Sequence, residues 1–320
     1  QTRSLQTGEE VYPVPELGTS QTKLENFVNC PFSYTCRNIL GLQEKKGGAV
    51  EVNEIGTVFH SVLEGVVKES LEKGERFGST ADEELRCRVS RIIEQLKTQI
   101  LGEEENVFLE QFFSRVRESA CILAMNLRDE LEQSRFEPKF CELKFGLTGE
   151  EKEFTLPAVV TTGENRVRIR GCADRVDACR IGGKVYLRVV DYKTGSKEFD
   201  VVSLYQGLQL QLMVYIKAAV EREEKRHPGK EIVPSGVFYY RIQDPLLDGK
   251  VMDEILRGTE EEKKEQMEKE MLKVLRPDGL VNLSGENLKH LQKIQSGDSV
   301  AVPVKYTKSG SLSKTSKVAS

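Results

Sequence analysis

The chain has 320 residues, which allows one large elaborated domain or two smaller ones with a sizeable core. It contains 38% hydrophobic and 31% charged residues, and no apolar run approaches the roughly 18 residues of a membrane helix, which argues against a membrane-spanning protein. The 47 basic and 51 acidic side chains give a formal charge of −4, so any basic, DNA-binding surface must be local.

The seven cysteines include no CxxC pair, which argues against a disulfide framework and a self-contained zinc site. A reducing, cytoplasmic setting is therefore expected. Residues 1–19 and 307–320 lack hydrophobic periodicity, so we expect an unstructured linker and an unstructured tail. Both ends resemble cut edges of a longer protein.

The first half of the chain favours helices. Ser20 suits the N-cap of a short helix over 22–29, and Pro31 suits the first turn of a second one. Apolar residues at helical spacing predict a long helix from residue 53 to about residue 74. Two more amphipathic helices are expected in a helical insertion at about 75–135, which offers no evident chemistry.

The pattern changes to strands after residue 139. Alternating runs with Gly and Asn between them predict strands over 140–145, 153–160, 167–178 and 185–190. A helix is expected over 204–221, a strand over 232–242, and peripheral charged helices within 255–296. This order predicts an α+β domain with a mixed sheet over residues 20–306.

Gly182 and Gly183 fit a two-residue hairpin turn. That turn places Asp174 directly opposite Asp191, on one face of the sheet with Cβ atoms about 4.5 to 5.5 Å apart. Because side chains alternate along a strand, Lys193 projects from the same face. Two carboxylates and one ammonium group are therefore expected to converge.

Carboxylates this close repel each other unless a positive group lies between them, and a divalent cation is the obvious candidate. Oxygen ligands suit Mg²⁺ or Mn²⁺, which polarise phosphoryl oxygens and activate water, while Lys193 would position that water or offset developing charge. This is the chemistry of phosphodiester hydrolysis. For an Asp-x-Lys pattern alone the alternative is a solvated surface hairpin, but the apolar residues before Asp191 favour a buried strand.

The segment around these residues is basic. Residues 166–197 hold nine basic and three acidic side chains, a net charge of +6. Arg166, Arg168 and Arg170 alternate along one strand face, which suits phosphate contacts; a solvated sheet face is an equally favoured alternative.

The Gly-x-x-Asp-Arg-x-Asp motif at 171–177, followed by Asp-Tyr-Lys-Thr-Gly at 191–195, resembles the PD-(D/E)XK nuclease superfamily in its RecB-like form. Segments 56–64, 207–215 and 235–240 resemble two helices and a strand of that family. The resemblance implies a restriction-endonuclease-like core with flanking helices and a helical insertion.

The resemblance also implies roles for single residues. Asp174 and Asp191 match the metal ligands, Lys193 matches the catalytic lysine, and His60 matches an active-site histidine that would complete the metal shell. By itself, a histidine such as His60 is more often a core-edge residue.

Supporting roles are implied for other residues of the same motifs. Gln211 and Tyr215 would hold the catalytic hairpin or contact a phosphate, although Tyr215 is equally suited to the core. Glu64 is expected on the helix surface, outside the metal shell. Glu142 resembles a recurrent acidic position, and its role stays open.

The order of the motifs, with Cys-Pro-Phe at Cys30, resembles most the carboxy-terminal nuclease domain of AddB-type subunits of bacterial helicase/nucleases. This implies an exonuclease acting on single-stranded DNA from an unwound duplex, beside an A-type subunit, in recombination and repair of double-strand breaks by DNA end resection. It also implies that Cys30 is one ligand of a [4Fe-4S] cluster. No cysteine follows Cys179, so we expect the cluster not to assemble in this chain. Cys36 fits no ligand spacing with Cys30 and is expected to be an ordinary thiol.

Two alternatives stay open. One is a stand-alone RecB-like nuclease such as the CRISPR-associated adaptation nucleases; the expected linker at residues 1–19 favours a subunit instead. The other is a catalytically silent nuclease fold used for DNA binding and subunit assembly. Asp174, Asp191 and Lys193 argue against it, because such a module needs no opposed carboxylates.

Overall fold

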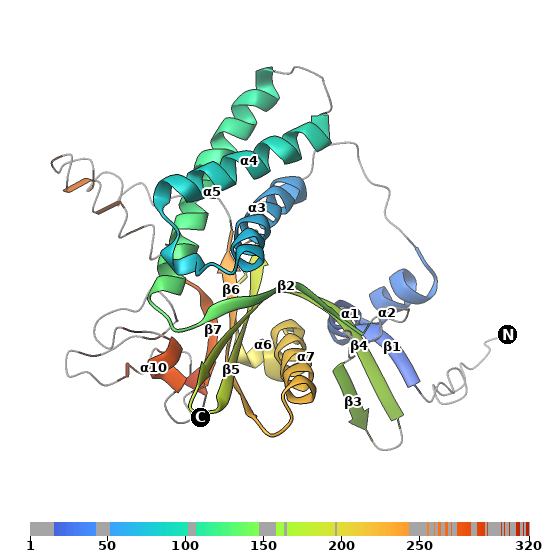
Figure 1. Ribbon diagram of the computed structural model, residues 1–320. Helices are drawn as coiled ribbons and strands as arrows, with labels where there is room; N and C mark the ends of the chain where they lie inside the picture. The colour runs from blue at the N-terminus through green and yellow to red at the C-terminus, as the bar shows by residue number, and fades with distance from the viewer. Residues whose placement is uncertain are drawn as a thin grey trace.

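A computed structural model of the chain describes residues 16–42, 52–101, 107–146, 158–162, 165–195, 197–242, 274–282 and 287–291, with single residues or pairs between 255 and 319. None of the helices in these segments is long and apolar enough to cross a membrane. A mixed sheet with helices on both faces forms the centre of this part of the chain (Figure 1).

The sheet has eight strands in the described residues. They are β1 (Glu16–Ser20), β2 (Glu137–Phe145), β3 (Ala158–Thr162), β4 (Asn165–Ile181), β5 (Lys184–Lys193), β6 (Glu231–Arg241), β7 (Asp278–Asn282) and β8 (Val318–Ala319). The hydrogen-bonded order is β1-β4-β5-β6-β7-β8, and β2 and β3 also pair with β4. The first part of β4 pairs with β1 and β3 and the rest with β2 and β5, so β4 joins two parts of the sheet.

The hairpin of β4 and β5 has the expected register. Gly182 and Gly183 make its turn with φ angles of 59° and 79°, which glycine adopts without strain. Pairing runs from residues 181 and 184 to residues 175 and 190. Because β5 then pairs in parallel with β6, the sheet is mixed, as the order of elements predicts.

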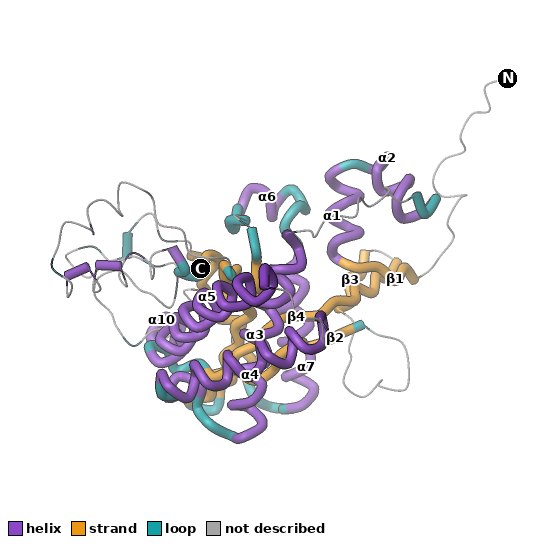
Figure 2. Tube along the Cα trace, turned by 90° about the horizontal axis from the view of Figure 1, so that it is seen from above, coloured by secondary structure: helices purple, strands orange, loops and turns teal. Residues whose placement is uncertain are grey.

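The helices pack on both faces of the sheet and beside its edge. They are α1 (Gln21–Asn29), α2 (Pro31–Tyr34), a π-helical turn η1 (Thr35–Ile39), α3 (Val52–Lys73), a 3-10 turn η2 (Phe77–Ser79), α4 (Asp82–Leu101), α5 (Val107–Glu132), α6 (Val201–Tyr205), α7 (Gln211–Arg226) and α10 (Asn287–Leu291). Helices α3, α4 and α5 pack together on one side, whereas α1 and α2 lie beside β1 and β3 (Figures 1 and 2). The helical insertion expected at about 75–135 corresponds to η2, α4 and α5.

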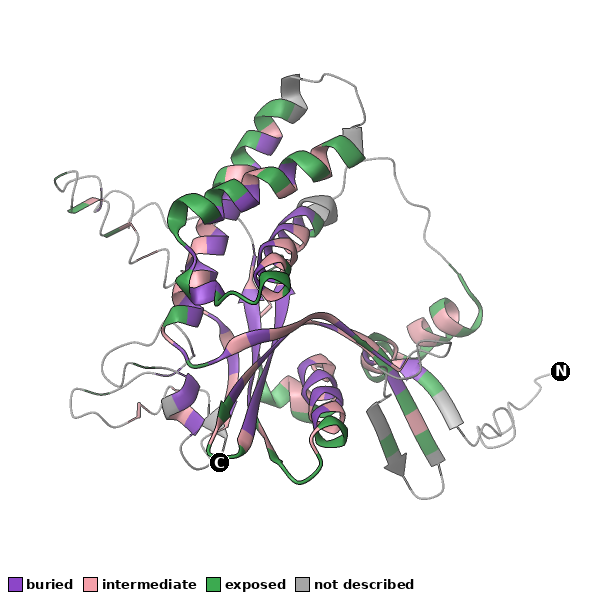
Figure 3. Ribbon diagram, viewed as in Figure 1, coloured by how far each residue is buried: buried purple, intermediate pink, exposed green. Residues whose placement is uncertain are grey.

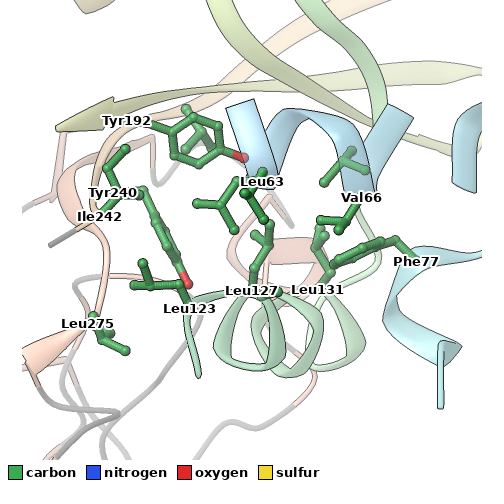
Figure 4. Packing of buried hydrophobic residues seen from close by; sticks show 14 of the residues in the cluster. Leu63, Val66, Phe77, Leu123, Leu127, Leu131, Tyr192, Tyr240, Ile242 and Leu275 are labelled. Carbon is green, nitrogen blue, oxygen red and sulfur yellow. The ribbon is translucent and has the colours of Figure 1, made fainter. Parts of the chain in front are cut away.

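Side chains of β5 alternate between two hydrophobic cores. Val190 and Tyr192 join the core that contains α3 and α5 (Figure 4), whereas Val185, Leu187 and Val189 join the core that contains α7. The strand is accordingly buried along most of its length (Figure 3). A strand buried on both faces holds its last residues, which include Asp191, in a fixed position.

Four charged side chains are also buried against α5. Arg175, Asp177, Arg188 and Glu130 are each at most 2% exposed. Asp177 contacts Arg175 Nε at 2.9 Å and Arg188 Nε at 2.8 Å, and Glu130 contacts Arg188 Nη1 at 2.7 Å and Arg175 Nη2 at 3.3 Å. The two cations and two anions form a closed ring. Because a buried charge without its partner is costly, the ring fixes α5 on β4 and β5.

Three expectations about local structure are wrong. Residues 16–19 belong to β1 instead of a linker, and Val318–Ala319 form β8 within the expected tail, because backbone pairing with a neighbouring strand leaves no side-chain periodicity. The helix expected over 204–221 is divided into α6 and α7, since Gly207 adopts a φ of 80° that ends the first helix. Residues 153–157 and most of 255–273 lie outside the described residues.

Candidate active site

Asp174 and Asp191 lie at the end of the β4–β5 hairpin, directly beyond the last ladder pair of Arg175 and Val190. Asp174 Oδ2 accepts a hydrogen bond from the backbone N–H of Tyr192 at 2.7 Å, which fixes its carboxylate across the hairpin. Asp191 is 1% exposed. Burial, together with the charge of Asp174, raises the pKa of Asp191 to about 7.

Lys193 and Gln211 surround the carboxylate of Asp191. Lys193 Nζ forms an ion pair with Asp191 Oδ2 and donates to Gln211 Oε1 at 2.9 Å. Gln211 Nε2 lies 2.8 Å from Asp191 Oδ1 and 3.0 Å from the hydroxyl oxygen of Tyr215. The amide of Gln211 therefore orients both the ammonium and the carboxylate. The structure thus brings together two of the sequence motifs, one with Asp191 and Lys193 and the other with Gln211 and Tyr215.

His60 approaches Asp174 from α3. Its Nε2 lies 3.2 Å from Asp174 Oδ2 and 3.6 Å from Glu142 Oε1. The hydrogen bond with Asp174 raises the pKa of His60, while burial opposes the rise. Glu64, one turn further along α3, is also close: one ligand atom each of His60, Glu64 and Glu142 lies within 4.8 Å of the others. Burial and the charge of Glu142 raise the pKa of Glu64.

A glycine allows α3 to approach the hairpin this closely. A Cβ atom on Gly56 would lie 2.2 Å from Thr194 Cγ2, so any other residue there would require the Thr194 side chain or the helix to move. His60 follows Gly56 by about one helical turn and thus points toward the same strand end. This packing explains why Gly56 and His60 lie about one helical turn apart in the sequence.

Glu142 occupies a strained position in β2. It lies between the ladder pairs that join Cys141 to Arg175 and Leu143 to Ala173, which places it beside Asp174. Its φ of 52° is the only positive value at a non-glycine residue among those described. Such a backbone costs on the order of 1 to 2 kcal/mol. Strain of this kind concentrates where the surrounding structure holds a side chain in place for a function.

Glu64 and Glu142 are therefore closer to the site than the sequence indicates. Glu64, expected on the helix surface, is half-buried beside His60, because its i, i+4 spacing from the histidine puts both on one face. For Glu142 the motifs alone left the role open, since its place depends on the register of β2 against β4. No local pattern in the sequence reveals that register.

The donor set fits a divalent cation. The carboxylate of Asp174 accepts the N–H of Tyr192, the residue after Asp191, and contacts the imidazole of His60. Glu64 and Glu142 add two carboxylates around the same imidazole. Clustered carboxylates with one imidazole suit Mg²⁺ or Mn²⁺, and a cation would relieve their mutual repulsion.

The cysteines do not fit an iron–sulfur cluster by themselves. Cys30 caps α2, because its Sγ accepts the N–H of Ser33 at 3.4 Å. All seven cysteines lie in the described residues, and none of them belongs there to a group of three or more metal-ligating side chains. Four thiolates hold a [4Fe-4S] cluster, so these residues do not supply its ligand set.

The helix that precedes Cys30 is linked to the site by side chains that the sequence motifs do not single out. The carboxylate of Glu25 accepts the N–H of Leu210 at 2.8 Å and that of Gln211 at 3.2 Å, and thereby caps the first turn of α7. Gln21 Nε2 lies 3.4 Å from the hydroxyl oxygen of Tyr215. Both contacts join segments separated by more than 180 residues, which explains why local patterns miss them.

Comparison with known proteins gives two findings. Residues 19–305 match the family model described as the PD-(D/E)XK nuclease superfamily. The chain is also similar to proteins named as subunits of ATP-dependent helicase/deoxyribonucleases: 29% identical to that of Thermoanaerobacter sp. (strain X514) over 94% of this chain, 30% to that of Clostridium novyi (strain NT) over 92%, and 31% to that of Alkaliphilus metalliredigens (strain QYMF) over 93%. Each match covers 25% of the relative, so the chain spans about a quarter of the length of these curated relatives.

Proposed function

The chain belongs to the PD-(D/E)XK nuclease superfamily, and on that basis we propose that it is a metal-dependent deoxyribonuclease domain that degrades single-stranded DNA from an end. The observation that carries the proposal is that the end of one hairpin holds Asp191 in contact with Lys193 and Asp174 in contact with His60 of α3. A fold kept only for DNA binding or assembly would not need a buried carboxylate held by a lysine, with a second carboxylate at the same hairpin end.

Asp174, Asp191 and His60 would hold Mg²⁺ or Mn²⁺, with Glu142 and Glu64 close enough to adjust the charge of the site. When bound, the cation would supply Lewis-acid chemistry at the attacked phosphate. Asp191 has to lose its proton to serve as a ligand, and its raised pKa places that step near neutral pH.

Lys193 would act on the phosphate and on the attacking water. Its ammonium group is held by Asp191 and Gln211, so it is oriented before the substrate arrives. A preorganised cation stabilises the negative charge that develops on the phosphoryl oxygens, and its N–H groups can orient a water molecule. Gln211 and Tyr215 would serve to keep this arrangement in place.

The wider context follows from the names of the relatives. Since they are subunits of ATP-dependent helicase/deoxyribonucleases, we propose that this chain is the nuclease part of such a subunit in the bacterial cytoplasm. It would degrade strands released by unwinding, together with an A-type partner subunit, during end resection in recombination and double-strand break repair. Cys30 would be one ligand of the [4Fe-4S] cluster implied by that resemblance, with the other ligands supplied from outside these residues.

Nuclease assays on matched variants test the proposal. Asp191→Asn and Lys193→Gln should each lower Mg²⁺- or Mn²⁺-dependent degradation of linear single-stranded DNA by about a hundredfold or more. Lys184→Gln is the control, because Lys184 lies at the opposite end of β5 in an exposed pair with Glu231. Circular single-stranded DNA should stay intact. Full activity of Asp191→Asn or Lys193→Gln would show that the chemistry lies elsewhere, and inactivity of the unaltered chain would favour the silent-fold alternative.

A further inference from the structure

A basic cavity lies directly beside Lys193. Its volume is about 240 Å³, enough for several water molecules at about 30 Å³ each and therefore for a phosphate group. The residues that line it are Lys193, Lys197, Glu198, Tyr239, Arg241, Val274, Arg276 and Asp278. The four basic and two acidic residues among them leave an excess of positive charge.

The parallel pairing of β5 and β6 builds this cavity. Asp191 pairs with Tyr239 and Lys193 pairs with Arg241. Because side chains two residues apart on a strand point to the same side, these four side chains share one face of the sheet. A hydrogen bond of 2.9 Å from the N–H of Ile242 to the carbonyl of Lys193 keeps the two strand ends in register. Arg241 is therefore placed next to the proposed catalytic lysine by backbone geometry.

The aromatic ring of Tyr239 lies beneath two of the ammonium groups. Lys193 Nζ lies 5.5 Å and Lys197 Nζ lies 5.3 Å from the centre of this ring. Tyr239 is buried, with 2% of its surface exposed. Contacts of this type attract cations but do not neutralise them. The ring thus holds two positive charges at one wall of the cavity.

Two of the four cations that line the cavity have no ion pair with a carboxylate in the described segments. Lys197 and Arg241 are half-buried, yet neither forms an ion pair within the part of the chain that the structure describes. Because partly buried charges are normally paired, the unbalanced side chains indicate an anionic ligand.

We propose that this cavity binds the phosphate that neighbours the scissile phosphate of a single-stranded DNA substrate, with Lys197 and Arg241 as its ligands. The inference rests on the proposed nuclease function, since it takes the scissile phosphate to lie at Lys193. A strand that passes Lys193 brings its next phosphate to the wall formed by Lys197 and Arg241. The guanidinium group of Arg241 offers a planar fork for two phosphate oxygens, and Lys197 adds a point charge.

Salt dependence of DNA binding tests the subsite without catalysis. Binding of a fluorescent single-stranded oligonucleotide is measured by anisotropy in EDTA, between about 50 and 200 mM KCl. Each phosphate contact on a single strand contributes about 0.7 to the slope of log affinity against log salt. We expect Lys197→Gln and Arg241→Gln each to reduce the slope by about that amount, Arg241→Lys to retain it, and the distant control Lys184→Gln to leave it unchanged.

Different results would refute the phosphate subsite and the proposed nuclease function. If the unaltered chain binds and degrades the oligonucleotide, but Lys197→Gln and Arg241→Gln both bind with its slope, the subsite is wrong and the nuclease proposal stands. If the unaltered chain neither binds nor degrades single-stranded DNA, the proposed function fails and the subsite with it. Urea unfolding of each variant shows whether the fold is intact, and Arg241→Lys provides a folded comparison if Arg241→Gln is not.

Discussion

Replacement of Glu25 by alanine should weaken the active site from a distance. Helix α7 begins at Gln211, and its N-cap residue Leu210 has no side-chain acceptor, so the carboxylate of Glu25 supplies the cap. Loss of a capping acceptor costs about 1 kcal/mol, and loss of a negative charge at a helix N-terminus about 0.3 to 1 kcal/mol. Glu25→Ala should therefore lower the free energy of unfolding by about 1 to 2 kcal/mol.

The same change should slow the nuclease. Gln211 is the first residue of α7, and it orients both Lys193 and Asp191. If the first turn of α7 frays, that orientation is lost for part of the time. About 1.4 kcal/mol of lost positioning corresponds to a tenfold lower kcat. Because Glu25 lies in the helix before Cys30, this contact would also transmit the state of the Cys30 segment to the site.

Urea unfolding followed by circular dichroism, amide hydrogen exchange at residues 210–214 and degradation of single-stranded DNA measure these effects. Glu25→Gln keeps an acceptor oxygen and should retain most of the activity and most of the exchange protection. Glu221→Ala is a matched control on the same helix, since Glu221 forms an exposed pair with Lys217, worth about 0.5 kcal/mol or less. If Glu25→Ala behaves like Glu221→Ala in stability, exchange and rate, the capping argument is wrong.

Four further predictions concern charged side chains of the site and of the buried ring. Burial raises the pKa of Asp191 to about 7, so the folded protein keeps this proton up to that pH, whereas the unfolded chain loses it near pH 3.9. The contribution of Asp191 therefore makes the metal-free protein less stable as pH rises from about 4 to about 7. The slope of unfolding free energy against pH should be smaller in Asp191→Asn. For the same reason Mn²⁺ affinity, measured by calorimetry, should rise about tenfold per pH unit below about 7 and level off above it. Glu142→Gly should stabilise the metal-free protein by about 1 kcal/mol, because it relieves the φ of 52°, and should weaken Mn²⁺ binding; unchanged affinity would remove Glu142 from the site. Glu130→Ala should destabilise the protein by about 3 to 5 kcal/mol, since Asp177 remains as the one carboxylate of the ring for the buried guanidinium groups of Arg175 and Arg188. Glu231→Ala in the exposed pair with Lys184 should change stability by about 0.5 kcal/mol or less.

The hairpin shows how far local chemistry determines a site. Two glycines fix the turn, and the turn fixes a register that runs to Arg175 and Val190. Asp174 and Asp191 follow directly beyond this pair, and Lys193 contacts Asp191. Each of these steps needs only residues close in the chain. The mixed α+β fold follows similarly from the order of helical and alternating segments.

Contacts between distant segments are what the sequence does not disclose. Glu142 reaches His60 only because β2 pairs with β4 in one register, and Glu25 reaches α7 across the fold. The buried ring of Arg175, Asp177, Arg188 and Glu130 unites three elements in the same way. The break before α7 has a different cause: the left-handed backbone of Gly207 interrupts a segment whose apolar pattern is continuous.

The proposed chemistry requires that Asp174 and Asp191 share one catalytic cation. A crystal structure of the chain grown with Mn²⁺, with an anomalous difference map recorded at the manganese edge, measures this directly. We predict one strong peak in contact with both aspartate carboxylates and with His60 Nε2, and Lys193 Nζ beside it but not bound to it. A peak elsewhere would contradict the proposed metal-dependent nuclease site. So would the absence of an ion at saturating Mn²⁺, with Asp174 still bound to the N–H of Tyr192 and Asp191 still bound to Lys193 and Gln211.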